Sequence, residues 1–334
     1  MDDDGGALAA IVVAADSGPV LADCVDALLA NDDVAALVLA DNASSDGVPE
    51  SVAAAHAGDH RLHLLTNAGN LGFGAAVNRA VAMLGDGPSL REDRRGAEAA
   101  SFRDRAQRGT RTLVVDREEP PATTDHGSAA ANDWLAIVNP DCIAPPAALA
   151  ELLRLARTTP RAGLLGAVVC DAAGVIEPAT RRRDPLLRRS LAALGLARGE
   201  GIAVEGAIEP VLQDVEAVSG ALMLVARPLF ERLGGFDEGY FLHCEDLDLC
   251  RRVRDAGQRV LLAGQVRVTH GKGSSSRHRP VFVAWHKHRG MWRWFRRHDP
   301  AARRLPTAAL VACGIWLHFA ASLPRLLWRK LRHS

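Results

Sequence analysis

The chain has 334 residues, enough for one large α/β domain with an extension, and 48% of them are hydrophobic, which is ample for a core. Lysine and arginine together number 40, and so do aspartate and glutamate, so the formal net charge is zero. This balance argues against a general nucleic-acid-binding protein, whose domain would be basic.

The cysteines and the first residues bear on the cellular compartment. Six cysteines are present and none forms a Cys-x-x-Cys pair, which indicates reduced thiols in a cytosolic protein. The start, MDDDGG, is acidic rather than basic and then apolar, so no secretory signal peptide is expected.

Apolar runs alternate with helical spacings in the first half of the chain. In order, the pattern predicts strand 8–15, helix 20–30, strand 34–40, a short helix, strand 61–66, helix 72–84 and strand 134–138. Such alternation indicates βαβ units and a parallel sheet, in which ligands bind at the carboxyl ends of the strands. Polar, glycine-rich or acidic clusters follow the second, third and fourth strands, which predicts a site at that edge.

Residues 86–132 interrupt the alternation. They are rich in Arg, Glu, Asp, Ala and Gly, contain Pro120-Pro121, and look like a strand only at 110–116. Their low apolar content predicts a solvated, mostly disordered insertion.

The second half has a less regular pattern. It predicts strands 162–170 and 217–226, a helix 245–256 that Gly257 terminates, and short strands 260–263 and 266–269. His270 follows the last strand and precedes a run of Gly, Lys and three serines, a composition typical of an anion or metal site.

Two acids lie just past predicted strands. Asp41 can accept a hydrogen bond from a base imide, or it can form an Asx turn or a helix cap. In the NPD motif at 139–141, the Asp141 carboxylate can hold a divalent metal that bridges two phosphates, although Asn-Pro-Asp is also a common turn.

Two further motifs open predicted helices. The NLGFG motif at 70–74, followed by Asn78 and Arg79, is either an anion-binding helix entry or a simple one, since glycines let backbone approach a ligand. The CEDLD motif at 244–248 puts acids in a first helical turn, where they suit the helix dipole and stay ionised as a general base must. Asp248 and Arg252 have the spacing of a surface ion pair.

Taken in order, these motifs resemble those of glycosyltransferase family 2 and, within it, bacterial rhamnosyltransferases. The matching pieces are ADNASSDG (40–47), NLGFG (70–74), NPD (139–141), SGA (219–221), GGFDE (234–238) and EDLDL (245–249), closing at His270. The resemblance implies an α/β fold of the GT-A type at 8–270, in which a mixed central sheet joins a Rossmann-like nucleotide-binding half to an acceptor half. A helical, basic C-terminal arm at 271–334 would follow.

The resemblance also implies roles for individual residues. Asp246 would be the general base with Glu245 beside it, and Asp141 and His270 would contact a divalent metal, Mg²⁺ or Mn²⁺, or the diphosphate. The residues implied to bind the nucleotide sugar are Asp41, Gly72, Gly74, Asn78, Arg79, Asn139, Ser219 and Gly220.

The implied reaction is transfer by direct displacement, with inversion, of L-rhamnose from dTDP-L-rhamnose to a lipid-linked saccharide in cell-surface polysaccharide assembly, as in O-antigen or a cell-wall polymer. Two alternatives stay open. A non-catalytic, membrane-associated scaffold is disfavoured because Asp141 and Asp246 are both present. A nucleotidyltransferase would want a glycine-rich, basic loop after the first strand, where the sequence reads AADSG at 14–18.

Two positions depart from the family pattern. The family usually has a polar and an aromatic residue at the end of strand one, where this sequence has Ala14-Ala15, which indicates weaker base stacking. Asn139 stands where relatives with two acids have aspartate, which indicates weaker metal affinity.

The last 64 residues, 271–334, are basic and rich in tryptophan, whereas residues 1–60 are acidic. Tryptophan favours the membrane interface, and basic side chains attract anionic lipid. The apolar run 308–323 ends at Pro324 and is short for a spanning helix. The pattern therefore predicts peripheral association with the inner face of the cytoplasmic membrane, with some of the tryptophans covering the core.

Overall fold

The computed structural model describes residues 8–85, 133–271 and 279–332. The predicted insertion at 86–132, with its strand-like segment at 110–116, lies outside the described residues. All six cysteines are within them and are free thiols, and only Cys313 is exposed.

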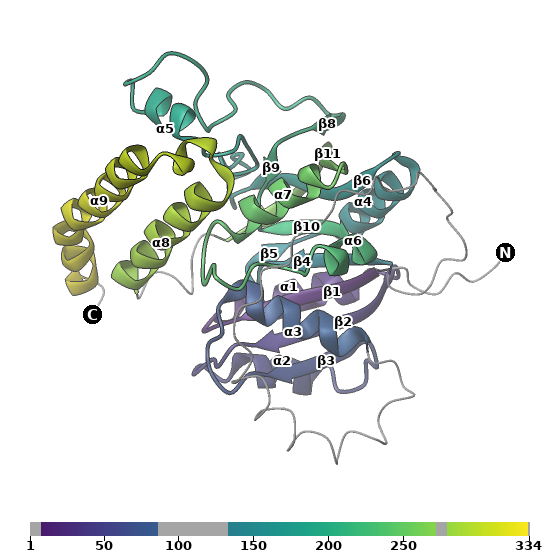
Figure 1. The fold of residues 1–334 in the computed structure, drawn as a ribbon. Coiled ribbons are helices and arrows are strands. Elements are labelled where there is room, and N and C mark those ends of the chain that lie inside the picture. The colour runs from purple at the N-terminus through teal and green to yellow at the C-terminus, as the bar shows by residue number, and fades with distance from the viewer. Residues whose placement is uncertain (1–7, 86–132, 272–278, 333–334) are drawn as a thin grey trace, which may run out of the picture.

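A nine-stranded mixed sheet forms the centre of the protein, in the order β3-β2-β1-β4-β10-β6-β11-β5, with β8 paired to β11 (Figure 1). Its strands are β1 (Leu8–Ala14), β2 (Val34–Asp41), β3 (Leu62–Thr66), β4 (Trp134–Val138), β5 (Cys142–Ile143), β6 (Ala162–Cys170), β8 (Leu212–Asp214), β10 (Leu222–Ala226) and β11 (Arg259–His270). Strands β1 to β4 run parallel, and β10 lies antiparallel between β4 and β6. The predicted mixed sheet with a Rossmann-like half is confirmed.

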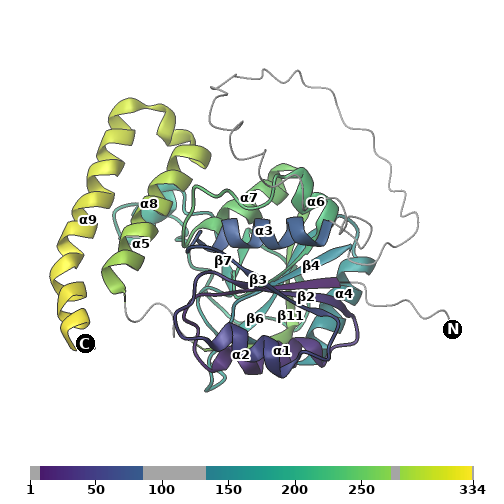
Figure 2. The ribbon, with the colours of Figure 1, turned by 90° about the horizontal axis from the view of Figure 1, so that it is seen from below.

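Helices cover both faces of this sheet (Figure 2). One face carries α1 (Val20–Leu29), α2 (Val48–Ala55) and α4 (Pro146–Thr158), and the other carries α3 (Phe73–Gly85), α6 (Arg227–Arg232) and α7 (Glu245–Asp255). Strand β1 shows why its sequence is apolar throughout: Leu8, Ala10 and Val12 join the first core, whereas Ala9, Ile11 and Val13 join the second.

Two strand predictions are wrong in their extent. The strand expected at 217–226 is divided at Ser219-Gly220, because β9 (Ala217–Val218) leaves the main sheet and pairs with β7 (Arg181–Arg182). The two strands expected at 260–263 and 266–269 are one strand, β11, whose pairing with β6 shifts register between Ala263 and Arg267. Gly264 lies at this irregularity, where a Cβ would stand 1.9 Å from a carbonyl oxygen.

The C-terminal arm is a helical hairpin on one side of the domain (Figure 1). It consists of α8 (Pro280–His298), a short 3-10 helix η3 (Pro300–Arg303) and α9 (Leu305–Arg332), and it lies near α5 (Leu187–Ala193). Trp294 of α8 is 1% exposed and belongs to the second core, so α8 is packed into the domain. Helix α9 lies along α8, with the rings of Trp285 and Trp316 4.8 Å apart.

Helix α9 is longer than its sequence indicated. It continues through Pro324, where the apolar run was expected to end. The stretch 305–328 has a mean hydropathy of 1.5 and no buried share, so by length and composition it can cross a membrane.

Candidate active site

A cavity of about 460 Å³ opens where β1, β2 and β4 end, which is the edge that the sequence predicted. Its polar wall includes Asn42, Asn70, Asn139, Asp141 and His270. Its apolar wall comes from the 241–243 turn and from the first turn of α8. The volume is that of a small-ligand site.

Neutral amides fix the loops after β2 and β3. The Asn42 side chain accepts a hydrogen bond from the Leu71 N–H at 2.9 Å and donates to Asn70 Oδ1 at 3.0 Å. Gly72 has a φ of +85°, and a Cβ there would lie 2.6 Å from the Phe241 carbonyl oxygen. Only glycine fits this position. The NLGFG loop is therefore preformed and lines the cavity without an acid.

Asp41 does not line the cavity. It is 2% exposed, and its Oδ1 accepts a hydrogen bond from the Ser44 N–H at 2.9 Å, which is the Asx turn left open above. Asp16, which the sequence analysis did not select, does line it. Hydrogen bonds from Ser45, the backbone one first, lower the pKa of Asp16. The sequence signal that could have identified Asp16 is its position directly after the first predicted strand.

The second part of the NLGFG region serves another purpose. Asn78 Nδ2 donates to the Phe236 carbonyl at 2.9 Å, and Asn78 Oδ1 accepts from the Phe236 N–H at 2.8 Å. Gly74 lets the same segment approach, since a Cβ there would be 2.9 Å from Phe236 Cβ. Arg79 is exposed, and none of these three residues lines the cavity. Asn78 and Gly74 dock the loop that precedes α7.

The polar end of the cavity joins residues that are far apart in the sequence. Asp141 Oδ1 lies 3.2 Å from His270 Nε2, and Asn139 Nδ2 lies 3.3 Å from the same nitrogen. On the other side of the ring, His270 Nδ1 lies 3.3 Å from Glu177 Oε1. Burial would lower the pKa of His270, but the hydrogen bonds and charges of Asp141 and Glu177 outweigh burial and raise it.

This arrangement fits a divalent cation. If Nδ1 carries the proton toward Glu177, Nε2 turns a lone pair toward the Asp141 carboxylate, an arrangement that a cation between them would stabilise. Within the described ranges, no group of three or more His, Cys, Asp or Glu is arranged to hold a metal. Two protein ligands suffice for Mg²⁺, which takes its remaining ligands from phosphate and water. The sequence analysis did not find Glu177, because 93 residues separate it from His270.

The acids that open α7 face the small β7–β9 sheet. Asp246 Oδ2 accepts a hydrogen bond from Arg182 at 2.5 Å, and Asp246 Oδ1 accepts from the Leu247 N–H at 2.8 Å. Gly220 lies against this carboxylate, since a Cβ there would be 3.4 Å from Oδ2. Ser219 is buried beside it, and neither residue lines the cavity. The turn before α7 does line it, so the start of the helix adjoins the cavity.

The two acids differ in charge state. Burial and the charge of Asp246 raise the pKa of Glu245. Burial would also raise the pKa of Asp246, but the charge and hydrogen bond of Arg182 outweigh burial and lower it. At neutral pH Asp246 is therefore the ionised member of the pair, as a general base requires.

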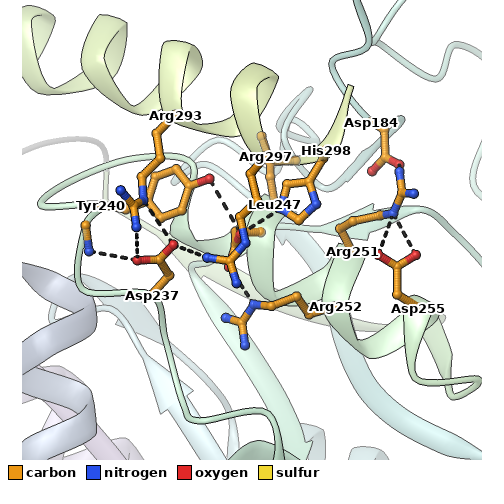
Figure 3. Close-up of polar contacts among 12 residues, drawn as sticks. Asp184, Asp237, Tyr240, Leu247, Arg251, Arg252, Asp255, Arg293, Arg297 and His298 are labelled. Atoms are coloured by element: carbon orange, nitrogen blue, oxygen red, sulfur yellow. Dashed lines mark hydrogen bonds and ion pairs between the residues drawn. The ribbon is translucent and has the colours of Figure 1, made fainter. Parts of the chain in front are cut away.

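Helix α8 is bound to the segment before α7 by charge. Asp237 accepts hydrogen bonds from Arg293, at 2.7 Å, and from Arg297 (Figure 3). Gly290 allows close packing, since a Cβ there would lie 2.8 Å from the carbonyl oxygen of His243. The arm therefore covers the turn that forms the apolar wall.

The expected pair of Asp248 and Arg252 forms at 2.6 Å, but it is buried and not on the surface. The reason is α8, whose His298 places Nε2 2.7 Å from Asp248 Oδ1. Burial would raise the pKa of Asp248, but His298 and Arg252 outweigh it and lower that pKa.

Solved structures of known proteins share this fold. The mannosyltransferase PcManGT from Pyrobaculum calidifontis, in complex with GDP-Man and Mn²⁺, has a TM-score of 0.52 at 16% identity, over 97% of this chain and 73% of that one. GalNAc-T7, with UDP, GalNAc and Mn²⁺, has a TM-score of 0.52 at 13% identity, over 88% and 48%. At these identities the likeness concerns the fold.

Sequence comparison then gives the family. Residues 6–296 match the family described as "Glycosyltransferase like family 2". The N-acetylglucosaminyl-diphospho-decaprenol L-rhamnosyltransferase of Mycobacterium tuberculosis (strain CDC 1551 / Oshkosh) is 30% identical over 303 residues, 86% of each chain. Rhamnosyltransferase WbbL of Escherichia coli (strain K12) is 50% identical over 46 residues, 14% of this chain and 17% of WbbL. The protein belongs to glycosyltransferase family 2 and is a glycosyltransferase, which confirms the resemblance.

Proposed function

We propose that the protein transfers L-rhamnose from dTDP-L-rhamnose, with inversion, to a hydroxyl of a lipid-linked saccharide. The observation that carries the reaction type is one cavity that has Asp141 and His270 at its polar end and adjoins Asp246 through the 241–243 turn. The sugar and the acceptor class follow the M. tuberculosis relative, whose name states L-rhamnose and N-acetylglucosaminyl-diphospho-decaprenol. The product would enter cell-surface polysaccharide assembly.

The donor would lie against the neutral NLGFG loop. A nucleoside diphosphate is an anion, so a wall of amides and glycine backbone accepts it without repulsion. Asp141 and His270 would hold a divalent cation, Mg²⁺ or Mn²⁺, which would offset the charge on the leaving diphosphate. Asn139 lies beside this pair and lines the same cavity, with its Nδ2 3.3 Å from His270 Nε2.

The acceptor would be activated from the α7 side. Asp246 takes the proton of the acceptor hydroxyl while the hydroxyl oxygen attacks the anomeric carbon. The bond from that carbon to the diphosphate breaks at the same time, and the nucleoside diphosphate leaves with the electron pair. A single displacement inverts the anomeric centre and leaves no covalent enzyme intermediate.

The test is transfer by the full-length protein with Mg²⁺ and N-acetylglucosaminyl-diphospho-polyprenol. We expect dTDP-L-rhamnose to be used at a kcat/KM at least about 10-fold above UDP-glucose or GDP-mannose, which corresponds to about 1.4 kcal/mol. NMR of the product should show an anomeric configuration opposite to that of the donor. Preference for another donor would show that the proposed donor sugar is wrong. Retention of the anomeric configuration would refute direct displacement.

We also propose that the protein lies on the inner face of the cytoplasmic membrane through α9. One side of this helix packs on α8, where His318 Nδ1 lies 2.9 Å from His288 Nε2. The other side is apolar and exposed, with Leu310 at 74% and Leu317 at 69%. A helix that is packed on one side and apolar on the other favours lying in the interface over crossing it. Exposed Arg303, Arg304 and Arg325 add attraction to anionic lipid.

Co-sedimentation with liposomes tests this placement. Full-length protein should bind vesicles that contain anionic lipid, and less at high salt. The double variant Leu310→Glu with Leu317→Glu should lose binding. Its matched control, Ala54→Glu with Ala57→Glu on the exposed side of the β2–β3 connection, should keep it. If only detergent releases the protein, α9 spans the membrane. Equal binding by all three proteins would show that α9 does not mediate membrane binding.

A further inference from the structure

Three consecutive arginines stand at β7, and each has a different partner. Arg181 donates to Gln213, and Arg183 donates to Glu200, and neither contact involves α7. Arg182 alone of the three reaches the start of α7. Neighbouring side chains on a strand point to opposite faces, which separates Arg182 from the other two.

Arg182 fixes the orientation of one carboxylate. Its Nη2 donates to Asp246 Oδ2 at 2.5 Å and to the Val218 carbonyl at 2.9 Å. Asp246 Oδ1 is bonded to the Leu247 N–H at 2.8 Å. The carboxylate is thus anchored through both oxygens, and each oxygen keeps a second lone pair. Gly220 packs against the Oδ2 side without a side chain, since a Cβ there would lie 3.4 Å from Oδ2.

This arrangement is costly if its purpose is only structural. The Arg182 side chain is 20% exposed and that of Asp246 is 15%, so both charges are largely removed from water. Arg182 Nε is buried and has no hydrogen-bond partner among the described residues. Desolvated ion pairs with an unmet donor contribute little net stability, which points to a role in the reaction.

We propose that Arg182 is a positioning residue that holds the Asp246 carboxylate, through Oδ2, in the orientation in which it takes the proton of the acceptor hydroxyl. The inference rests on the proposed function, in which Asp246 is the base. Arg182 contacts no reacting atom and acts through Asp246.

Electrostatics support the role. The groups that face Asp246 are Arg182 from β7, Glu245 and the Cys250 thiol from α7, and His243 and the Cys244 thiol from the preceding turn. Of these, Arg182 is the permanent cation. Without it, Glu245 and Asp246 would share one proton, and a proton on Asp246 would remove the base.

The experiment compares the pH dependence of kcat/KM for wild type, Arg182→Gln and the control Arg183→Gln in the full-length protein. A base loses activity as pH falls through its pKa, so loss of Arg182 should move the acid limb upward by about 1 to 3 pH units. At pH 5 the Arg182→Gln variant should be about 10-fold or more slower than wild type and should recover above pH 8. Arg183→Gln should keep the wild-type limb, and donor affinity should be unchanged in both variants.

Arg182→Lys keeps the proposal testable if Arg182→Gln does not fold. Lysine preserves the charge but cannot bridge Asp246 and Val218, so a smaller upward shift is expected. An unshifted limb in the folded variant overturns the proposal, as does equal loss in Arg183→Gln. Asp246→Asn separates the two levels. If that variant is inactive while Arg182 variants keep the wild-type limb, only the positioning role fails. If Asp246→Asn turns over normally, the proposed base fails.

Discussion

The cavity wall after β2 and β3 is built from neutral amides, whereas α7 and its neighbours are held by charges. On the first side, Asn42 and Asn70 bond each other and the loop backbone. On the second side, three aspartates of low exposure are paired with arginines: Asp237, Asp246 and Asp248. The two regions adjoin one cavity but use different chemistry.

The difference between the amide wall and the charged region follows from the group that each would bind. A bound nucleoside diphosphate brings its own negative charge, so further acids on that wall would repel it. A base must stay ionised although it is desolvated, and nearby arginines supply the opposing charge. If this comparison is right, substitutions on the charged side change chemistry and stability, and those on the amide side change donor affinity.

The largest expected effect is at Asp246. Asp246→Asn removes the proton acceptor and should lower kcat by about 10²- to 10⁴-fold, the usual size of a general-base contribution. Binding of the nucleotide donor, measured by calorimetry, should not change, because the base acts only in the transition state. A near-normal kcat would show that Asp246 is not the general base, and Glu245 would be tested next. The comparison of the two regions would then fail.

Metal removal comes next. Excess EDTA should abolish transfer, and Mg²⁺ or Mn²⁺ should restore it. Asp141→Ala should remove metal-dependent nucleotide affinity, and Glu177→Gln should weaken Mn²⁺ binding about 10- to 100-fold, as loss of a partner to a ligating histidine does. Mn²⁺ paramagnetic resonance with nucleoside diphosphate measures both variants without turnover. Full activity in EDTA would contradict the metal site.

The same division explains what the sequence could predict. Strand β1 is apolar at every position because both its faces are buried, so its range could be predicted almost to the residue. The NPD and EDLDL motifs lie at element ends, where local pattern is informative. The contacts of Arg182 with Asp246, 64 residues apart, and of α8 with Asp248 depend on tertiary packing of charged side chains, which has no periodic signal. Helix α8 reads as an exposed basic arm for the same reason.

Asp248 tests the stability of the charged side. Asp248→Asn leaves Arg252 and His298 without their buried partner and should lower the free energy of unfolding at pH 7 by about 3 kcal/mol. The pKa of Asp248 is lowered in the folded protein, so the wild-type advantage should be complete above its unfolded pKa of about 3.9 and should fade at lower pH. Urea unfolding at pH 7, 5 and 3 measures this.

Asp255→Asn is the control, because the Asp255 side chain is 51% exposed in its pair with Arg251, so its loss should cost less than about 1 kcal/mol. Equal losses in the two variants would show that burial by α8 adds nothing to the Asp248 pair. A loss in Asp248→Asn that stays constant down to pH 3 would mean that its contribution is not ionic.

The smallest effects should separate two asparagines of one motif region. Asn70 lines the cavity and accepts a hydrogen bond from the Gly72 N–H at 3.0 Å, so Asn70→Ala should raise the donor KM about 5-fold, equivalent to about 1 kcal/mol, with little change in unfolding. Asn78 bonds both backbone groups of Phe236 outside the cavity, so Asn78→Ala should cost about 1 to 2 kcal/mol of stability and leave KM unchanged. Steady-state kinetics at varied donor concentration, with thermal unfolding of the same samples, gives both quantities. An equal increase of KM in Asn78→Ala and Asn70→Ala would show that Asn78 contributes to donor binding although it lies outside the cavity.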